Sequence, residues 1–191
     1  TDPKEQYLTN ITFSLDAKTI FIAIVNREQN HMKLNSYDAN TGEKIKTLFE
    51  EKDDKYTEPQ HSLYFLKNNP KLFVWQSQKD GYNHLYLYDT DGKLIRQLTK
   101  GNGIVTDIVG VDKEEKFLYF TAALESPIEN HIYKTEIKTG KITKLTKESG
   151  IHYGKLSEDG NYLLDSYSNL ETPAITQIIE TRTGKTINEV F

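Results

Sequence analysis

The sequence predicts an all-β fold of four four-stranded antiparallel blades, which together form a partial, open β-propeller. A glycine followed by Lys or Glu recurs at intervals of 50, 48 and 44 residues, at Gly42, Gly92, Gly140 and Gly184. Each glycine lies in a predicted turn between two β-rich runs, and a period of about 40 to 50 residues is typical of propeller blades. Aromatic residues make up 11% of the chain, which favours strands over helices.

The first strand of each predicted blade is a short run that ends in a polar turn. Residues 16–18, 68–70, 112–114 and 158–160 form these turns. They follow the runs at residues 11–14, 61–66, 104–111 and 153–156. Asn, Asp and Gly tolerate the backbone angles of a tight reversal, so each turn predicts a hairpin to the next strand.

The second strand of each blade is short and almost continuously apolar or aromatic, as expected for a strand buried on both faces. These runs cover residues 20–25, 72–76, 118–122 and 162–166. The third strand begins near His31, His84, His131 and Ala174, and the glycine turn then leads into the fourth. The predicted blades cover residues 8–49, 60–100, 103–147 and 151–191 within a single domain, residues 1–191.

An ordinary β-sandwich with turns every 8 to 12 residues is the alternative fold. The fourfold match of turn type and strand order favours blades. In such a blade the first-to-second and third-to-fourth turns share one end of the sheet, and the other connections share the opposite end. The longer loops, at residues 26–30, 49–60, 78–83 and 124–130, all fall at the second end. We therefore expect binding there.

The composition excludes several classes of function. Charges are scattered and sum to -4, so no basic stripe exists to neutralise nucleic-acid phosphates. No run of about 18 apolar residues predicts a membrane span, and residues 1–6 lack the apolar core of a signal peptide. The chain has no Cys and therefore no disulfide or thiolate metal site, although this leaves its compartment open.

No catalytic motif is visible. A Gly-x-Ser-x-Gly nucleophile elbow is absent, and the similar segment at residues 154–160 has the wrong spacing, so Ser157 is interpreted as a turn residue. Three of the five His residues occupy equivalent blade positions, which favours packing over metal ligation. His61 and His152, near first strands, are interpreted as structural. The sequence therefore predicts no catalytic residue, no cofactor and no metal site.

Five further features are candidates for structural or binding roles. The acidic run at residues 50–54 is interpreted as a solvated linker or, alternatively, as a lip that attracts cations. Arg27, with Asn26, follows a buried strand and is expected to anchor one blade or domain to another, with a ligand contact as the alternative. We expect Trp75 to pack between blades and its indole N–H to find an acceptor. His84, at the start of a third strand, is a further candidate anchor.

Several segments together resemble the N-terminal propeller of the dipeptidyl peptidase IV family, within the prolyl oligopeptidase clan of serine peptidases. The segments are residues 26–30, 75–86 (WQSQKDGYNHLY), 96–101, 119–121, 130–133 and 144–146. They occur in the same order over essentially the whole chain. The resemblance implies an eight-bladed propeller, of which this chain is about half, followed by an α/β-hydrolase domain with a Ser-Asp-His triad.

The same resemblance implies a function for the parent protein, which would release dipeptides from free N-termini. This chain would form part of the wall that gates substrate access and would pack against the hydrolase domain and the remaining blades. Family members carry an aromatic residue in an inter-blade linker of the substrate pocket, which makes Tyr56, with Glu58, the candidate substrate-facing residues. The family's paired Glu motif has no match here, and Glu50–Glu51 is not assigned that role.

The relatives imply a bacterial protein of the periplasm or the cell surface. A free-standing propeller that binds a protein or glycan on its long-loop end is the alternative function, and a self-sufficient enzyme is a third. Sheets that lose their neighbours expose apolar faces, so we also expect the isolated chain to self-associate.

Overall fold

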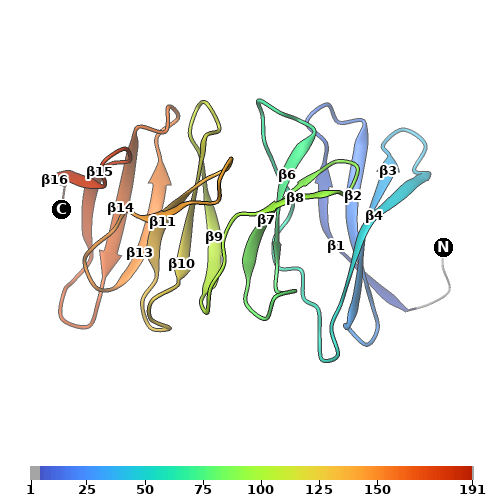
Figure 1. Ribbon diagram of the computed structural model, residues 1–191, viewed down its shortest axis with the longest axis horizontal. Coiled ribbons are helices and arrows are strands. Elements are labelled where there is room, and N and C mark those ends of the chain that lie inside the picture. The colour runs from blue at the N-terminus through green and yellow to red at the C-terminus, as the bar shows by residue number, and fades with distance from the viewer. Residues whose placement is uncertain (1–4, 191) are drawn as a thin grey trace. The chain divides into compact units, whose positions relative to one another are not determined.

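The computed structural model describes residues 5–190 as four separate antiparallel sheets, each with four strands in chain order (Figure 1). The first sheet contains β1 (Gln6–Phe13), β2 (Thr19–Asn26), β3 (His31–Asp38) and β4 (Lys44–Lys52). The second contains β5 (Tyr64–Phe65), β6 (Leu72–Ser77), β7 (His84–Asp89) and β8 (Leu94–Gln97). Each sheet is a simple meander, in which every strand pairs with the strand before it.

The remaining two sheets repeat this plan. The third contains β9 (Ile104–Val111), β10 (Phe117–Ala123), β11 (His131–Glu136) and β12 (Ile142–Lys144). The fourth contains β13 (Ile151–Leu156), β14 (Tyr162–Ser168), β15 (Ile175–Glu180) and β16 (Lys185–Glu189). Every regular element between residues 5 and 190 is a strand, so the predicted all-β class and the four blades are confirmed. The structure also holds no helix long and apolar enough to cross a membrane within these residues.

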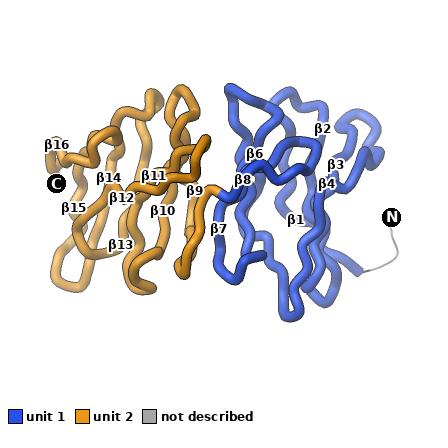
Figure 2. The backbone as a smooth tube through the Cα atoms, in the orientation of Figure 1, with its two compact units in different colours: residues 1–97 blue, residues 98–191 orange. Residues whose placement is uncertain are grey.

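The sheets group into two compact units, residues 1–97 and residues 98–191 (Figure 2). Within unit 1, strand β7 has five consecutive buried residues, the pattern expected for a strand covered on both faces. Strand β2 instead alternates, because its Phe21, Ala23 and Val25 are buried while the residues between them are half-buried. The first sheet therefore buries one face against the second sheet and leaves its other face less covered.

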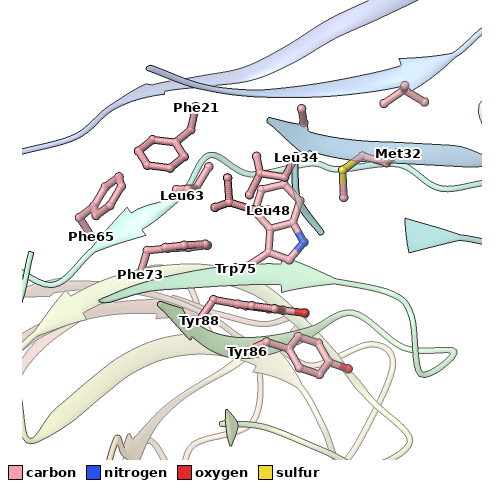
Figure 3. Close-up of a cluster of buried hydrophobic side chains, with 12 residues drawn as sticks. Phe21, Met32, Leu34, Leu48, Leu63, Phe65, Phe73, Trp75, Tyr86 and Tyr88 are labelled. Atoms are coloured by element: carbon pink, nitrogen blue, oxygen red, sulfur yellow. The ribbon is translucent and has the colours of Figure 1, made fainter. Parts of the chain in front are cut away.

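The core of unit 1 is aromatic and lies between its two sheets (Figure 3). Trp75 on β6 is completely buried and meets Phe49 on β4 edge to face, with ring centroids 5.8 Å apart. Phe49 also stacks on Tyr88 at 4.4 Å. These contacts join the first sheet to the second, because aromatic rings bury much apolar surface and gain further from edge-to-face and offset packing.

Unit 2 is held by a smaller apolar cluster and by buried polar contacts between its sheets. The apolar cluster consists of Tyr119, Ile132, Leu145, Leu163 and Ile179. Lys134 on β11 is buried, and its Nζ donates a hydrogen bond to the carbonyl oxygen of Thr181 at 2.6 Å. This bond ties the third sheet to the turn after β15 in the fourth.

All four repeated glycines lie where the sequence predicts them, in the connection between the third and fourth strands of a sheet. Their φ angles are 73° at Gly42, 91° at Gly92, 76° at Gly140 and 70° at Gly184. This left-handed region is costly for any residue with a Cβ. The surroundings differ, however: a Cβ at Gly92 would lie 2.2 Å from the backbone oxygen of Leu48, whereas a Cβ at Gly42 meets nothing within 4 Å.

This difference gives a matched pair of substitutions. Gly92→Ala should destabilise unit 1 by about 2 to 3 kcal/mol, because the positive φ costs about 1 kcal/mol or more and the clash with strand β4 adds to it. Gly42→Ala should destabilise unit 1 only by the cost of the positive φ, about 1 kcal/mol. Urea unfolding followed by circular dichroism compares the two variants. Equal losses would contradict the close approach of the turn to Leu48.

Candidate ligand-facing cavity

The largest loop of unit 1, the linker from β4 to β5, borders a cavity of about 450 Å³. The opposite wall comes from the end of β6 and the loop that follows it. Both segments lie at the end of the sheets where the sequence places the long loops, the lower end of unit 1 in Figure 1. The lining residues are Glu51–Pro59 from the linker side and Gln76–Lys79 with Gly81 from the other.

Local hydrogen bonds fix the start of this linker. The Asp53 carboxylate accepts the backbone N–H groups of Lys55, at 2.8 Å, and Tyr56, at 3.3 Å. The linker is also joined to the β2–β3 hairpin, because the N–H of Thr57 donates to the carbonyl oxygen of Gln29 at 2.6 Å. The turn therefore presents Tyr56 to solvent, with 56% of its surface exposed.

Glu51 forms a polar wall of the cavity. It lies near the end of β4, and its Oε1 accepts the indole N–H of Trp75 at 3.1 Å. Burial raises the pKa of the Glu51 carboxyl, while hydrogen bonds from Ser77 and Trp75 and the charge of Lys79 act against that rise. A partly buried carboxylate beside the cavity favours a cationic or hydrogen-bond-donating group on a ligand.

Lys79 lies on the other wall, against two tyrosines. Its Nζ donates to the hydroxyl of Tyr88 at 2.7 Å and lies 3.9 Å from the ring centroid of Tyr86. The Tyr86 hydroxyl donates in turn to Asp80 at 2.8 Å. Burial lowers the pKa of Lys79, against the opposing charges of Glu51 and Asp80. The ammonium is therefore held in place by cation–π contact and hydrogen bonding.

The structure brings together two of the sequence-predicted site residues. Tyr56 and Glu58 both line the cavity, and Trp75 is linked to it through Glu51. Asn26 instead organises the β2–β3 hairpin, where its Oδ1 accepts the N–H groups of Asn30 at 3.0 Å and His31 at 2.9 Å. Asn26 lines a second hollow, which is also lined by Asn30, His31 and residues 52–54.

Arg27 and His84 lie apart from the cavity lining. Arg27 pairs with Glu5 at 3.3 Å and contacts the hydroxyl and ring of Tyr7, so these partners belong to the first sheet and the residue just before it. His84 is buried as the first residue of β7. Roles for Arg27 and His84 as anchors to another blade or domain stay predictions.

Sequence reasoning missed Glu51 and Lys79. The acidic run is divided rather than uniformly solvated, because β4 extends to Lys52 and turns successive side chains to opposite faces. Glu50 thus pairs with His31 at 2.7 Å and Lys33 at 3.3 Å, while Glu51 reaches Trp75. Lys79 follows β6, the strand of the buried Trp75, by two residues, whereas Glu51 lies within β4 and carried no distinct sequence signal.

The three equivalent histidines each begin the third strand of a sheet, at the first residues of β3, β7 and β11. Among residues 5–190, no group of three or more His, Asp or Glu side chains is arranged to hold a metal ion. The described residues therefore offer this cavity polar and charged groups but no metal-ligand set.

Comparisons with known proteins agree on one family. Residues 1–174 match the family described as Dipeptidyl peptidase IV (DPP IV) N-terminal region. Over 108 residues, 56% of this chain, the sequence is 33% identical to "Dipeptidyl peptidase 4" of Arthroderma otae. Over 161 residues, 78% of this chain, it is 28% identical to the "Probable dipeptidyl-aminopeptidase B" of the same fungus. These matches span only 14% and 18% of the two relatives.

Two solved bacterial structures match the whole chain. A putative dipeptidyl aminopeptidase IV from Bacteroides ovatus gives a TM-score of 0.92 at 35% identity, with 30% of that chain covered. Porphyromonas gingivalis dipeptidyl peptidase 4 gives a TM-score of 0.86 at 27% identity, with 27% of that chain covered. The four sheets thus correspond to a part of these larger proteins, which confirms the partial propeller fold.

Proposed function

This chain belongs to the family of the dipeptidyl peptidase IV N-terminal region, and from this premise we propose that it is the non-catalytic propeller portion of a serine exopeptidase that releases N-terminal dipeptides. The observation that carries the proposal is the match of the whole chain to a dipeptidyl aminopeptidase IV structure, with a TM-score of 0.92 at 35% identity. The missing nucleophile elbow supports a non-catalytic role for these residues. The proposal keeps residues 1–191 as one partial propeller domain, in a protein of the periplasm or the cell surface.

The cavity in unit 1 supports a part in substrate access. In the proposal, Tyr56 packs against an apolar side chain of the peptide, and the Glu58 carboxylate attracts positive charge on it. The Asp53 turn holds Tyr56, and the bond from Thr57 N–H to the carbonyl oxygen of Gln29 holds the linker next to Glu58, before substrate arrives. Such preorganisation lowers the entropy lost on binding.

The long-loop end of unit 2 supports docking of the α/β-hydrolase domain. Ile128, 81% exposed, lies in the β10–β11 loop, and the fully exposed Leu170 lies in the β14–β15 loop. The Asn169 side chain fixes the second loop, because its Oδ1 accepts the N–H groups of Glu171 and Thr172 at 2.9 and 2.8 Å. Apolar side chains held outward in this way suit a hydrophobic partner surface. The apolar faces exposed by the first and the fourth sheet are proposed to bind the remaining blades of the parent protein. In the isolated chain they are proposed to bind further copies of that chain.

The access proposal is tested in the parent enzyme. Tyr56→Ala and Glu58→Gln should each raise KM for a chromogenic Gly-Pro substrate by about tenfold and leave kcat within about twofold, because binding contacts are removed while the triad is untouched. Tyr82→Ala is the matched control, since Tyr82 is an exposed tyrosine of the neighbouring loop that does not line the cavity. Unchanged KM in both cavity variants would overturn the assignment of these residues. A parent enzyme without dipeptidyl peptidase activity would overturn the function itself.

A further inference from the structure

Two buried histidines meet between the two sheets of unit 2. His131 begins β11 and is 2% exposed, and His152 on β13 is 0% exposed. Their ring centroids lie 5.0 Å apart, and His152 also stacks on Tyr167 at 4.9 Å. A histidine pair at this distance inside a protein is sensitive to protonation, since a second positive ring would be neither solvated nor distant from the first.

The hydrogen bonds of His152 define its state. Its Nε2 lies 2.8 Å from the carbonyl oxygen of Glu148, which can only accept, so Nε2 carries a hydrogen. Its Nδ1 lies 2.9 Å from Oδ2 of Asp165, which is itself completely buried and also accepts from Gln177 at 3.0 Å. A proton therefore already lies between His152 and Asp165, and the pair is fully hydrogen-bonded.

The hydrogen bonds of His131 differ from those of His152, because a hydroxyl group rather than a carboxylate faces its Nδ1. The hydroxyl of Thr146 accepts the N–H of Ile132 at 3.1 Å and lies 3.0 Å from His131 Nδ1. The hydroxyl hydrogen is thus available to Nδ1, while Nε2 faces the Glu129 carboxylate at 3.3 Å. A neutral imidazole with its hydrogen on Nε2 satisfies all of these contacts, and the lowered pKa of His131 favours that neutral form.

The surrounding charges act on His131 in both directions. Burial lowers the pKa of His131, the charges of Lys144 on β12 and His152 on β13 lower it further, and Glu129 opposes them. Glu125 faces Lys144 at 2.7 Å and offsets part of that charge. The other titratable groups at the contact are Asp165 and Tyr167 on β14, Tyr133 on β11 and Glu148 in the β12–β13 linker.

We propose that the His131–His152 contact is a pH-sensitive joint between the third and fourth sheets, closed when His131 is neutral and loosened when His131 takes up a proton. Protonation would require a hydrogen on Nδ1, which removes the acceptor of the Thr146 hydroxyl and places a positive ring 5.0 Å from His152. The joint includes the bonds from Asn130 N–H to Gly150 O, 3.1 Å, and from His152 N–H to Asn130 O, 2.8 Å.

The direction of the effect follows from linkage. An opened joint lets His131 titrate near its ordinary pKa of about 6.5, whereas the closed joint keeps that pKa lower. At pH values between the lowered pKa and about 6.5, the open form therefore binds more protons than the closed form. The closed joint keeps its full stability above about pH 6.5 and loses stability as the pH falls through the lowered pKa of His131.

Amide hydrogen exchange on the 191-residue chain tests this joint. After correction for intrinsic rates, the opening constant reported by the amides of Asn130 and His152 should rise several-fold between pH 7.5 and 5.5, with a slope no steeper than about tenfold per pH unit for one proton. His131→Gln should remove this rise. An unchanged opening constant in the wild-type chain, or the same rise in His131→Gln, would overturn the proposal.

His31→Gln is the matched control. His31 holds the same first position in β3 and pairs with Glu50, and within residues 5–190 its ring is not part of a histidine–histidine contact like that of His131 with His152. This variant should keep the wild-type pH response of Asn130 and His152. A second measurement needs no variant: the NMR titration of the His131 ring in the wild-type chain, where a midpoint at or above about 6.5 would refute the joint.

Discussion

Trp75→Ala should destabilise unit 1 by about 4 kcal/mol, the range measured for large-to-small changes of a fully buried aromatic residue. The indole is completely buried, packs edge to face on Phe49 and donates to Glu51. Its removal would leave a cavity between the two sheets of the unit and remove one of the donors to a partly buried carboxylate. Urea unfolding by circular dichroism measures the loss.

Two controls make this result specific. Trp75→Phe keeps most of the apolar volume and should cost about half as much or less. Trp75 is also the single Trp of the chain, so its fluorescence in the wild-type protein reports unit 1 alone. In the alanine variant, hydrogen exchange of β3 and β6 amides should accelerate while that of β10 and β14 stays unchanged. A loss below about 1 kcal/mol would show that Trp75 does not hold the two sheets together.

Asp165→Leu should destabilise unit 2 by about 3 to 5 kcal/mol, the cost typical of removing one partner from a buried ion pair. The substitution leaves Nδ1 of His152 and the side-chain amide of Gln177 without their carboxylate partner. Both His152 and Asp165 are completely buried, so water cannot readily replace the lost bonds. The same unfolding experiment gives the magnitude, with β14 amides as the local reporter.

A double variant separates the lost pair from lost packing. His152→Leu combined with Asp165→Leu removes both polar groups, and much of the stability should return because an apolar pair can replace a buried ion pair at little cost. If the double variant lost as much stability as His152→Leu and Asp165→Leu lose in sum, a direct coupling between these residues would be contradicted.

Local sequence pattern was sufficient for the four sheets but not for the first strands of the first two sheets, whereas the strand predicted at residues 104–111 is β9 as the structure has it. The glycine turns and the apolar second strands predict the meander, since both depend on residues next to each other in the chain. The structure extends the first strand back to Gln6, past a bulge at Asn10 where φ is 54°, because pairing with β2 continues there. It reduces the strand predicted at residues 61–66 to Tyr64–Phe65. Both differences depend on cross-strand pairing, which composition does not encode.

The candidate site likewise combines residues that the sequence could select with residues that only contacts across the fold reveal. The linker of Tyr56 and Glu58 could be selected from its length and from the family resemblance. The part played by Glu51 could not, because it depends on the strand continuing through an acidic run and on Trp75, 24 residues away. The contact of His131 with His152 likewise forms between two sheets, whereas the sequence suggested only a packing or structural role for each histidine by itself.

The meander topology also has a consequence for synthesis on the ribosome. Every strand pairs only with its neighbours in sequence, so a sheet is complete as soon as its own four strands have been made. Among residues 5–190, no strand pairs in its sheet with a strand encoded far downstream, an arrangement that exposes many β proteins to aggregation. The chain can therefore fold vectorially, one sheet after another, in the order of translation.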